Sequence, residues 1–115
     1  MDDAHWPEFV RGLPMAVVPV SGLDARVVDD GACQVALFDF ASDAVVAEHT
    51  HADKWGVVVA GQMTLSVDGE ERAVAAGDSY FVPAGVPHGA RVLAGSRVIE
   101  IFAERRFELQ DPGSS

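Results

Sequence analysis

The sequence predicts an all-β domain, a sandwich or barrel made of many short strands. Runs rich in β-branched and aromatic residues recur at a spacing of about 8 to 12 residues, and clusters of Gly, Asp and Ser separate them. In one run Met63, Leu65 and Val67 alternate with polar residues, which is the pattern of a strand with one buried face. After residue 12 no stretch has the period of a long amphipathic helix.

Residues 1–14 are expected to form an N-terminal extension with one or two helical turns. An aspartate at position 2 or 3 can cap these turns, and Gly12 ends them. Trp6 and Phe9 give the segment an apolar face, which must bury against the barrel or against a second subunit.

Residues 15–109 are expected to form the barrel itself. Asp68-Gly69 is the strongest hairpin signal in the chain, because this dipeptide favours a two-residue β-turn. The last residues, 110–115, end in DPGSS and are expected to be a disordered tail. Strands are expected at 15–20, 25–28, 33–40, 44–51, 55–60, 63–67, 72–74, 80–82, 90–93 and 97–102.

Composition limits the partners and the compartment. The 115 residues suffice for one domain with its own core, and 8 basic against 18 acidic residues give a formal net charge of −10. Such a surface repels phosphate backbones and anionic lipids, so neither nucleic acid nor a membrane is an expected partner. The only cysteine, Cys33, is expected to be a small buried hydrophobe. With no disulfide pair and no signal-peptide core, a cytoplasmic protein is expected.

Two stretches carry histidines in suggestive positions. In an extended strand His49 and His51 point to the same side, so both can reach one ion if a third ligand comes from another strand. A pair of surface or core histidines without metal is the open alternative. His88 supplies the third candidate, because the Gly- and Pro-rich turn before it delivers it at the start of a strand.

These stretches resemble the two motifs of the cupin superfamily. The second motif, G-x5-P-x-G-x2-H, matches from Gly77 to His88 at every fixed position, and Val92 replaces its final Asn. The resemblance covers about residues 30 to 105 and implies a double-stranded β-helix, or jelly-roll barrel, preceded here by the short helical segment. It also implies that His49, His51 and His88 hold one divalent metal ion, which is Zn, Ni, Fe, Mn or Cu.

The first motif departs from the cupin pattern at its acidic ligand. Counting back from Gly61 places Lys54 there, and an ammonium repels a divalent ion. Three outcomes are open. Lys54 swings away to pair with an acid and leaves a three-histidine metal site, or it stays inside as a cation in an empty pocket. In the third, it is neutral with a depressed pKa and acts as a ligand or base.

The C-terminal strand carries a second resemblance. Glu100, Phe102 and Arg106 have the spacing of D-x-F-x-P-x-R in the small cupins of pectin and alginate breakdown, which linearise unsaturated uronates. The resemblance implies that Glu100 is a general acid or base, that Arg106 holds a substrate carboxylate, and that Phe102 and Lys54 contact the substrate. The open alternative makes Phe102 a core residue and Glu100 and Arg106 a surface ion pair.

The sequence thus favours a metal-dependent cupin acting on a small polar molecule, possibly a sugar acid, by isomerisation or ring opening. A non-catalytic module that binds or senses a small molecule, with or without metal, is the alternative. A homodimer is expected because a small jelly roll exposes sheet edges and apolar faces, with 15–20 as a candidate exchanged strand. Trp55 is expected in the core or at a subunit interface.

Overall fold

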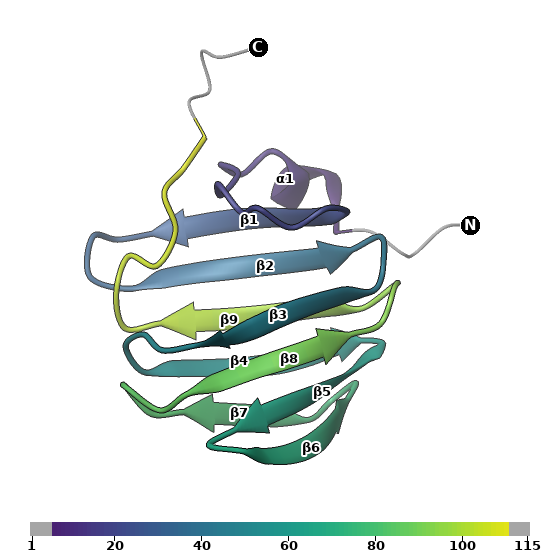
Figure 1. Ribbon diagram of the computed structural model, residues 1–115. Coiled ribbons are helices and arrows are strands. Elements are labelled where there is room, and N and C mark those ends of the chain that lie inside the picture. Colours follow the sequence, from purple (N-terminus) through teal and green to yellow (C-terminus); the bar gives the residue numbers. More distant parts are fainter. Residues whose placement is uncertain (1–5, 111–115) are drawn as a thin grey trace.

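The computed structural model describes residues 6–110 and folds them into two facing antiparallel sheets (Figure 1). The strands have the period-2 burial expected of sheets with one inner face, as in β2, where every second residue is buried. The elements are α1 Glu8–Arg11, β1 Leu23–Asp29, β2 Gln34–Phe40, β3 Ala44–His49, β4 Lys54–Ala60, β5 Gln62–Val67, β6 Glu70–Ala75, β7 Ser79–Val82, β8 His88–Val92 and β9 Arg97–Phe102.

The strand order confirms the predicted all-β jelly roll. One sheet has the order β1-β2-β9-β4-β7 and the other the order β3-β8-β5-β6. Strands far apart in sequence therefore pair directly, such as β2 with β9 and β3 with β8. This crossing connectivity brings the two histidine stretches together, because β3 ends with His49, β8 begins with His88, and the two residues pair.

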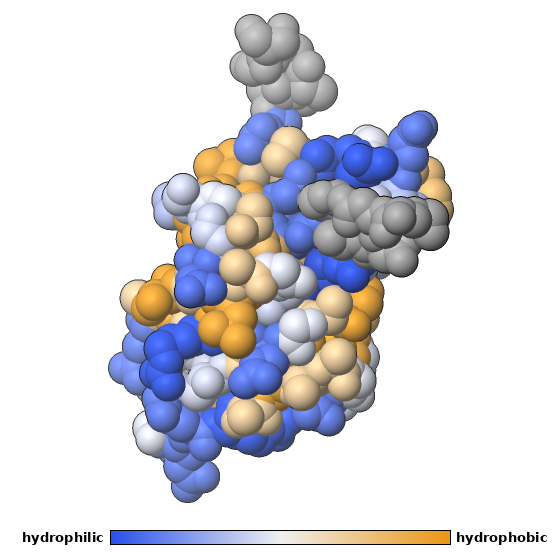
Figure 2. Space-filling view, turned by 90° about the vertical axis from the view of Figure 1, so that its right-hand side faces the viewer, coloured by the Kyte–Doolittle hydropathy of each residue, from blue (hydrophilic) through white to orange (hydrophobic). Residues whose placement is uncertain are grey.

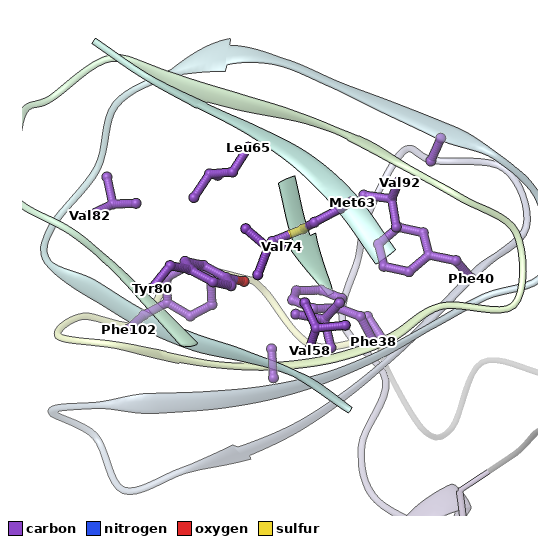
Figure 3. Packing of buried hydrophobic residues seen from close by; sticks show 14 of the residues in the cluster. Phe38, Phe40, Val58, Met63, Leu65, Val74, Tyr80, Val82, Val92 and Phe102 are labelled. Atoms are coloured by element: carbon purple, nitrogen blue, oxygen red, sulfur yellow. The ribbon is translucent and has the colours of Figure 1, made fainter. Parts of the chain in front are cut away.

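The core fills the space between the sheets. Figure 3 shows side chains from both sheets pointing toward one another, with Leu65 and Met63 opposite Tyr80, Phe102 and Val58. The Asp68-Gly69 hairpin forms as expected, since Asp68 and Gly69 have φ of 51° and 83°, and joins β5 to β6. Local turn chemistry thus accounts for this hairpin, and strand alternation accounts for the inward side chains.

Two expectations about strand and cysteine positions are wrong. Only Met15 and Ala16 of the segment 15–20 pair with other strands, and they do so through isolated bridges to Arg26 and Leu109. Pro19 lacks a donor, and the segment crosses from one partner to another instead of following one neighbour. Cys33 is exposed, because it lies in the turn before β2 and not in the strand.

The N-terminal segment is only partly as expected. The helix α1 begins at Glu8, after Pro7, and the expected capping by an aspartate at position 2 or 3 lies outside the described residues. Trp6 is buried, with the Arg97 guanidinium 5.7 Å from its ring centre, whereas Phe9 is 79% exposed. At the other end the Gln110 N–H donates to the Met15 carbonyl at 2.8 Å, and residues 111–115 lie outside the described range.

The outer face of the five-stranded sheet carries an apolar row. Cross-strand pairing places one apolar residue per strand side by side, and four of the five are at least 40% exposed. We call this set the outer row; it consists of Val28, Val35, Ile101, Trp55 and Phe81. Elsewhere the surface is mixed: on the side shown in Figure 2, hydrophobic areas alternate with hydrophilic ones. Between residues 6 and 110 no helix has the length and apolarity needed to span a membrane.

Candidate metal centre

Three histidines from two strands and one loop converge inside the barrel. His49 ends β3, His51 lies in the loop that follows, and His88 begins β8. One candidate ligand nitrogen from each lies within 4.8 Å of the others, and the ring centres are 4.4 to 5.1 Å apart. These residues come from the two patterned stretches of the sequence, which are 37 residues apart at His51 and His88.

A bulge in β3 turns His49 into the barrel. Val46 pairs with Ala90 and His49 pairs with His88, so three steps on β3 match two on β8. In a regular strand His49 would face away from the side that Val46 occupies, because the side-chain period is two. Gly89 makes the bulge possible, since a Cβ on this residue would lie 2.7 Å from the Val46 carbonyl oxygen.

Backbone carbonyls fix the orientation of all three rings. The Nδ1 atoms of His49, His51 and His88 lie 2.7, 2.7 and 2.9 Å from the carbonyl oxygens of Ala47, Ala52 and Val86. A neutral imidazole in this arrangement donates from Nδ1–H and keeps its lone pair on Nε2. The ligand atom of each ring is therefore the Nε2 atom, which is free for an ion.

The spacing of these lone pairs fits a bound cation. His51 Nε2 and His88 Nε2 are 2.9 Å apart, and two lone pairs at this distance repel unless a proton or a metal ion lies between them. Burial lowers the pKa of His88 to about 4 and the pKa of His51 below its usual value, so a proton is not held there at neutral pH. Two nitrogens on one ion are at most about 4.2 Å apart, and the histidine set fits with a small movement of its widest pair.

Lys54 points inward and pairs with an acid. Its Nζ lies 3.1 Å from Glu100 Oε2, and both side chains are about one-tenth exposed. The Tyr80 hydroxyl donates a hydrogen bond to the same oxygen. Burial raises the pKa of Tyr80, so the phenol keeps its proton and remains a donor. The structure thus combines two of the outcomes considered for Lys54, an internal cation and an ion pair.

Gly56 allows Tyr80 to reach Glu100. These residues lie on three adjacent strands, and Gly56 on β4 pairs with Tyr80 on β7 and with Glu100 on β9. A Cβ at Gly56 would lie 2.3 Å from Tyr80 Cζ, so the ring crosses β4 directly over this glycine. The sequence analysis missed both Tyr80 and Gly56; the one signal was a glycine inside a strand, which marks a close approach.

The other residues singled out in the C-terminal segment lie close by. Phe102 is buried, with its ring centre 5.3 Å from that of His51, and the Arg106 guanidinium is 4.8 Å from the Phe107 ring centre. Glu104 Oε2 accepts a hydrogen bond from the Ala52 N–H at 2.9 Å and so holds the loop that carries His51. Within residues 6–110 the surface ion pair of Glu100 with Arg106 is not formed, because Glu100 is buried against Lys54.

One cavity of about 420 Å³ collects all seven residues that the sequence singled out. The three histidines, Lys54, Glu100, Phe102 and Arg106 all line it. It therefore brings three neutral nitrogen donors, two cations and one carboxylate to the same space. Such a set can hold a metal ion and an anion side by side.

Comparisons with known proteins agree with this geometry. The cupin domain family model matches residues 36–102, more than half of the chain. The pectin degradation protein KdgF of Dickeya dadantii is 28% identical over 110 residues, which cover 93% of this chain and 92% of that protein. KdgF from Halomonas sp. has 29% identity and a TM-score of 0.70, over 79% of this chain and 86% of that one. An RmlC-like cupin from Shewanella frigidimarina has 26% identity and a TM-score of 0.74, over 92% and 94%.

Proposed function

The chain belongs to the cupin domain family, and on this basis we propose that it is a metal-dependent enzyme acting on a small oxygen-rich anion such as a sugar acid. The observation that carries the proposal is the convergence of three Nε2 lone pairs in a cavity that also holds Lys54, Glu100 and Arg106. The sugar acid is suggested by the relatives, two of which are named for pectin degradation or as KdgF.

The metal would be one divalent ion held by His49, His51 and His88. Nitrogen donors of this kind suit Zn, Ni, Fe, Mn or Cu, and donor type alone does not choose among them. When bound, the ion would polarise a carbonyl or hydroxyl oxygen as a Lewis acid. The carbonyls of Ala47, Ala52 and Val86 would keep the three imidazoles in the tautomer that binds it.

The charges near the centre favour an anionic ligand. The chain has a formal net charge of −10, yet Lys54 and Arg106 bring two cations to this cavity. Arg106 is half-buried, and its planar guanidinium can bind a carboxylate through two parallel hydrogen bonds. An incoming carboxylate would therefore meet two cations together inside the cavity, in a protein whose net charge is strongly negative.

Glu100 would act as the general acid or base. Its Oε2 atom is bound by Lys54 and Tyr80, and among residues 6–110 no donor binds the other carboxylate oxygen. Because Glu100 lines the cavity, that second oxygen is available to take a proton from a bound substrate and return it elsewhere. This proton transfer, together with a polarised oxygen, is what isomerisation or ring opening of a sugar acid needs.

A binding or sensing module is the second candidate, and one observation favours it. In the described structure Glu100 already has an ion pair with Lys54 and a hydrogen bond from Tyr80. The cavity can therefore hold an anion without a proton transfer by any of these residues. The two candidates share the ligand class. The enzyme needs the metal and turns its ligand over, whereas the binding module holds its ligand with or without metal.

The first experiment separates metal binding from turnover. Protein purified without chelator should contain one divalent ion per chain, and its thermal midpoint should fall on metal removal. His88→Ala should abolish that difference. With an unsaturated uronate as substrate, loss of the double-bond absorbance should require Glu100, and Glu100→Gln should bind metal without turnover. Metal-free protein with an unchanged midpoint would contradict the proposal, and metal binding without turnover would leave the binding module.

A further inference from the structure

The cavity extends well beyond the metal centre along a row of four phenylalanines. From the His51 ring the successive ring-centre distances are 5.3 Å to Phe102, 5.5 Å on to Phe107, 5.9 Å on to Phe38 and 6.2 Å on to Phe40. All four line the cavity. Figure 3 shows Phe102 beside Tyr80 at one end of the core and Phe40 beside Val92 at the other.

The polar residues of the cavity are gathered at the Phe102 end. Lys54 Nζ is 5.8 Å from the Phe102 ring centre, Glu100 binds Lys54, and Arg106 stacks on the neighbouring Phe107. The other end has none of these groups. We call it the apolar annexe, and its walls are Phe38, Phe40, Val20, Leu23, Val46 and Val92.

Part of the rim of the cavity is apolar as well. Val17 and Val45 both line it and are 53% and 74% exposed, so they form part of its rim. The segment that carries Val17 and Val20 approaches the cavity without strand pairing of its own beyond Met15 and Ala16.

From this separation we propose that the ligand is a carboxylic acid with an apolar body. The carboxylate lies at the metal end with Lys54 and Arg106, and the body fills the apolar annexe. A fully hydroxylated ring placed against these walls would leave its hydroxyls without partners, which is costly away from water. An apolar body gains from the same walls. The inference rests on the proposed function for the metal and the anionic head, and it replaces the sugar ring of that proposal with an apolar group.

Two carboxylic acids of similar size test the inference, one with an aromatic ring and one with a hydroxylated sugar ring. 3-Phenylpropanoate and D-galacturonate each carry one carboxylate, and their binding to the zinc-loaded protein is measured by calorimetric titration. Burial of one aromatic ring predicts that 3-phenylpropanoate binds at least about tenfold more tightly. Val20→Thr puts a hydroxyl into the annexe wall with little change of volume and should weaken its binding about fivefold or more. Val59→Thr, an exposed position outside the cavity, is the matched control and should change nothing.

The outcomes separate this inference from the proposed function. Equal or tighter binding of D-galacturonate, or an unaffected Val20→Thr protein, overturns the apolar annexe as a ligand site and leaves the metal-dependent sugar-acid enzyme standing. A protein that binds no zinc overturns the proposed function, while the ratio of the two acids on that protein still decides the inference. Tighter 3-phenylpropanoate binding that Val20→Thr weakens and Val59→Thr does not supports it.

Discussion

Lys54→Gln should tighten the binding of a divalent metal at least tenfold. In the structure Lys54 Nζ lies 5.8 Å from the Phe102 ring centre, which is itself 5.3 Å from the His51 ring centre. The ammonium is therefore within about 11 Å of that imidazole, where Coulomb's law at an effective dielectric constant of about 20 gives a repulsion of about 3 kcal/mol against a divalent ion. About 1.4 kcal/mol already corresponds to tenfold in affinity. The Glu100 carboxylate attracts the ion in both proteins, so the change in affinity comes from the lost ammonium.

Competition with a chromophoric chelator measures this change directly. Arg72→Gln is the matched control, because it removes the same charge from an exposed position on β6. The control should leave the affinity within about twofold, as screening by salt weakens exposed charges. If Lys54→Gln binds the metal no more tightly than the unchanged protein, or if Arg72→Gln gains as much, the ammonium does not oppose the ion and the electrostatic reasoning is wrong.

Three further outcomes follow from the described contacts. In metal-free protein, burial lowers the pKa of His88 to about 4, against about 6.5 unfolded. The unfolded chain then binds more protons between these values, so the thermal midpoint should fall as the pH drops from 6.5 toward 4, and less so in His88→Ala. Gly56→Ala forces a Cβ into the Tyr80 ring and should cost about 1 to 3 kcal/mol in urea unfolding, whereas Gly12→Ala, whose Cβ has room, should cost less than half of that. We also expect a homodimer that buries the outer row, so sedimentation should show a dimer that Trp55→Asp converts to monomer; a monomeric unchanged protein would contradict this.

Features encoded locally could be predicted from the sequence. Alternation placed Val98, Glu100 and Phe102 on one face of β9, and the burial of this strand follows that pattern. Turn chemistry located the Asp68-Gly69 hairpin. Both depend on a few consecutive residues, for which the strand period and the φ preferences of glycine and aspartate are strong guides.

Features that depend on which strands become neighbours could not be predicted. The contact of Tyr80 with Glu100 exists because β4 lies between β7 and β9 and carries Gly56 at the crossing point. Nothing near Tyr80 in the sequence encodes that order. The Lys54 ion pair has the same origin, since its partner Glu100 is on β9 and the two strands pair only in the folded sheet. Counting along the motif could place Lys54 near the metal but could not name its partner.

The bulge in β3 makes the metal centre depend on a residue that is not a ligand. If β3 paired regularly with β8 beyond Val46, His49 would face outward, while the strand and the core behind it are kept. Gly89 on β8 leaves the space that the bulge needs, so a larger residue there would act on the ligand set from the neighbouring strand. Metal-binding and metal-free members of such a family can therefore differ at a position that binds no metal, which a comparison of the ligand residues alone would overlook.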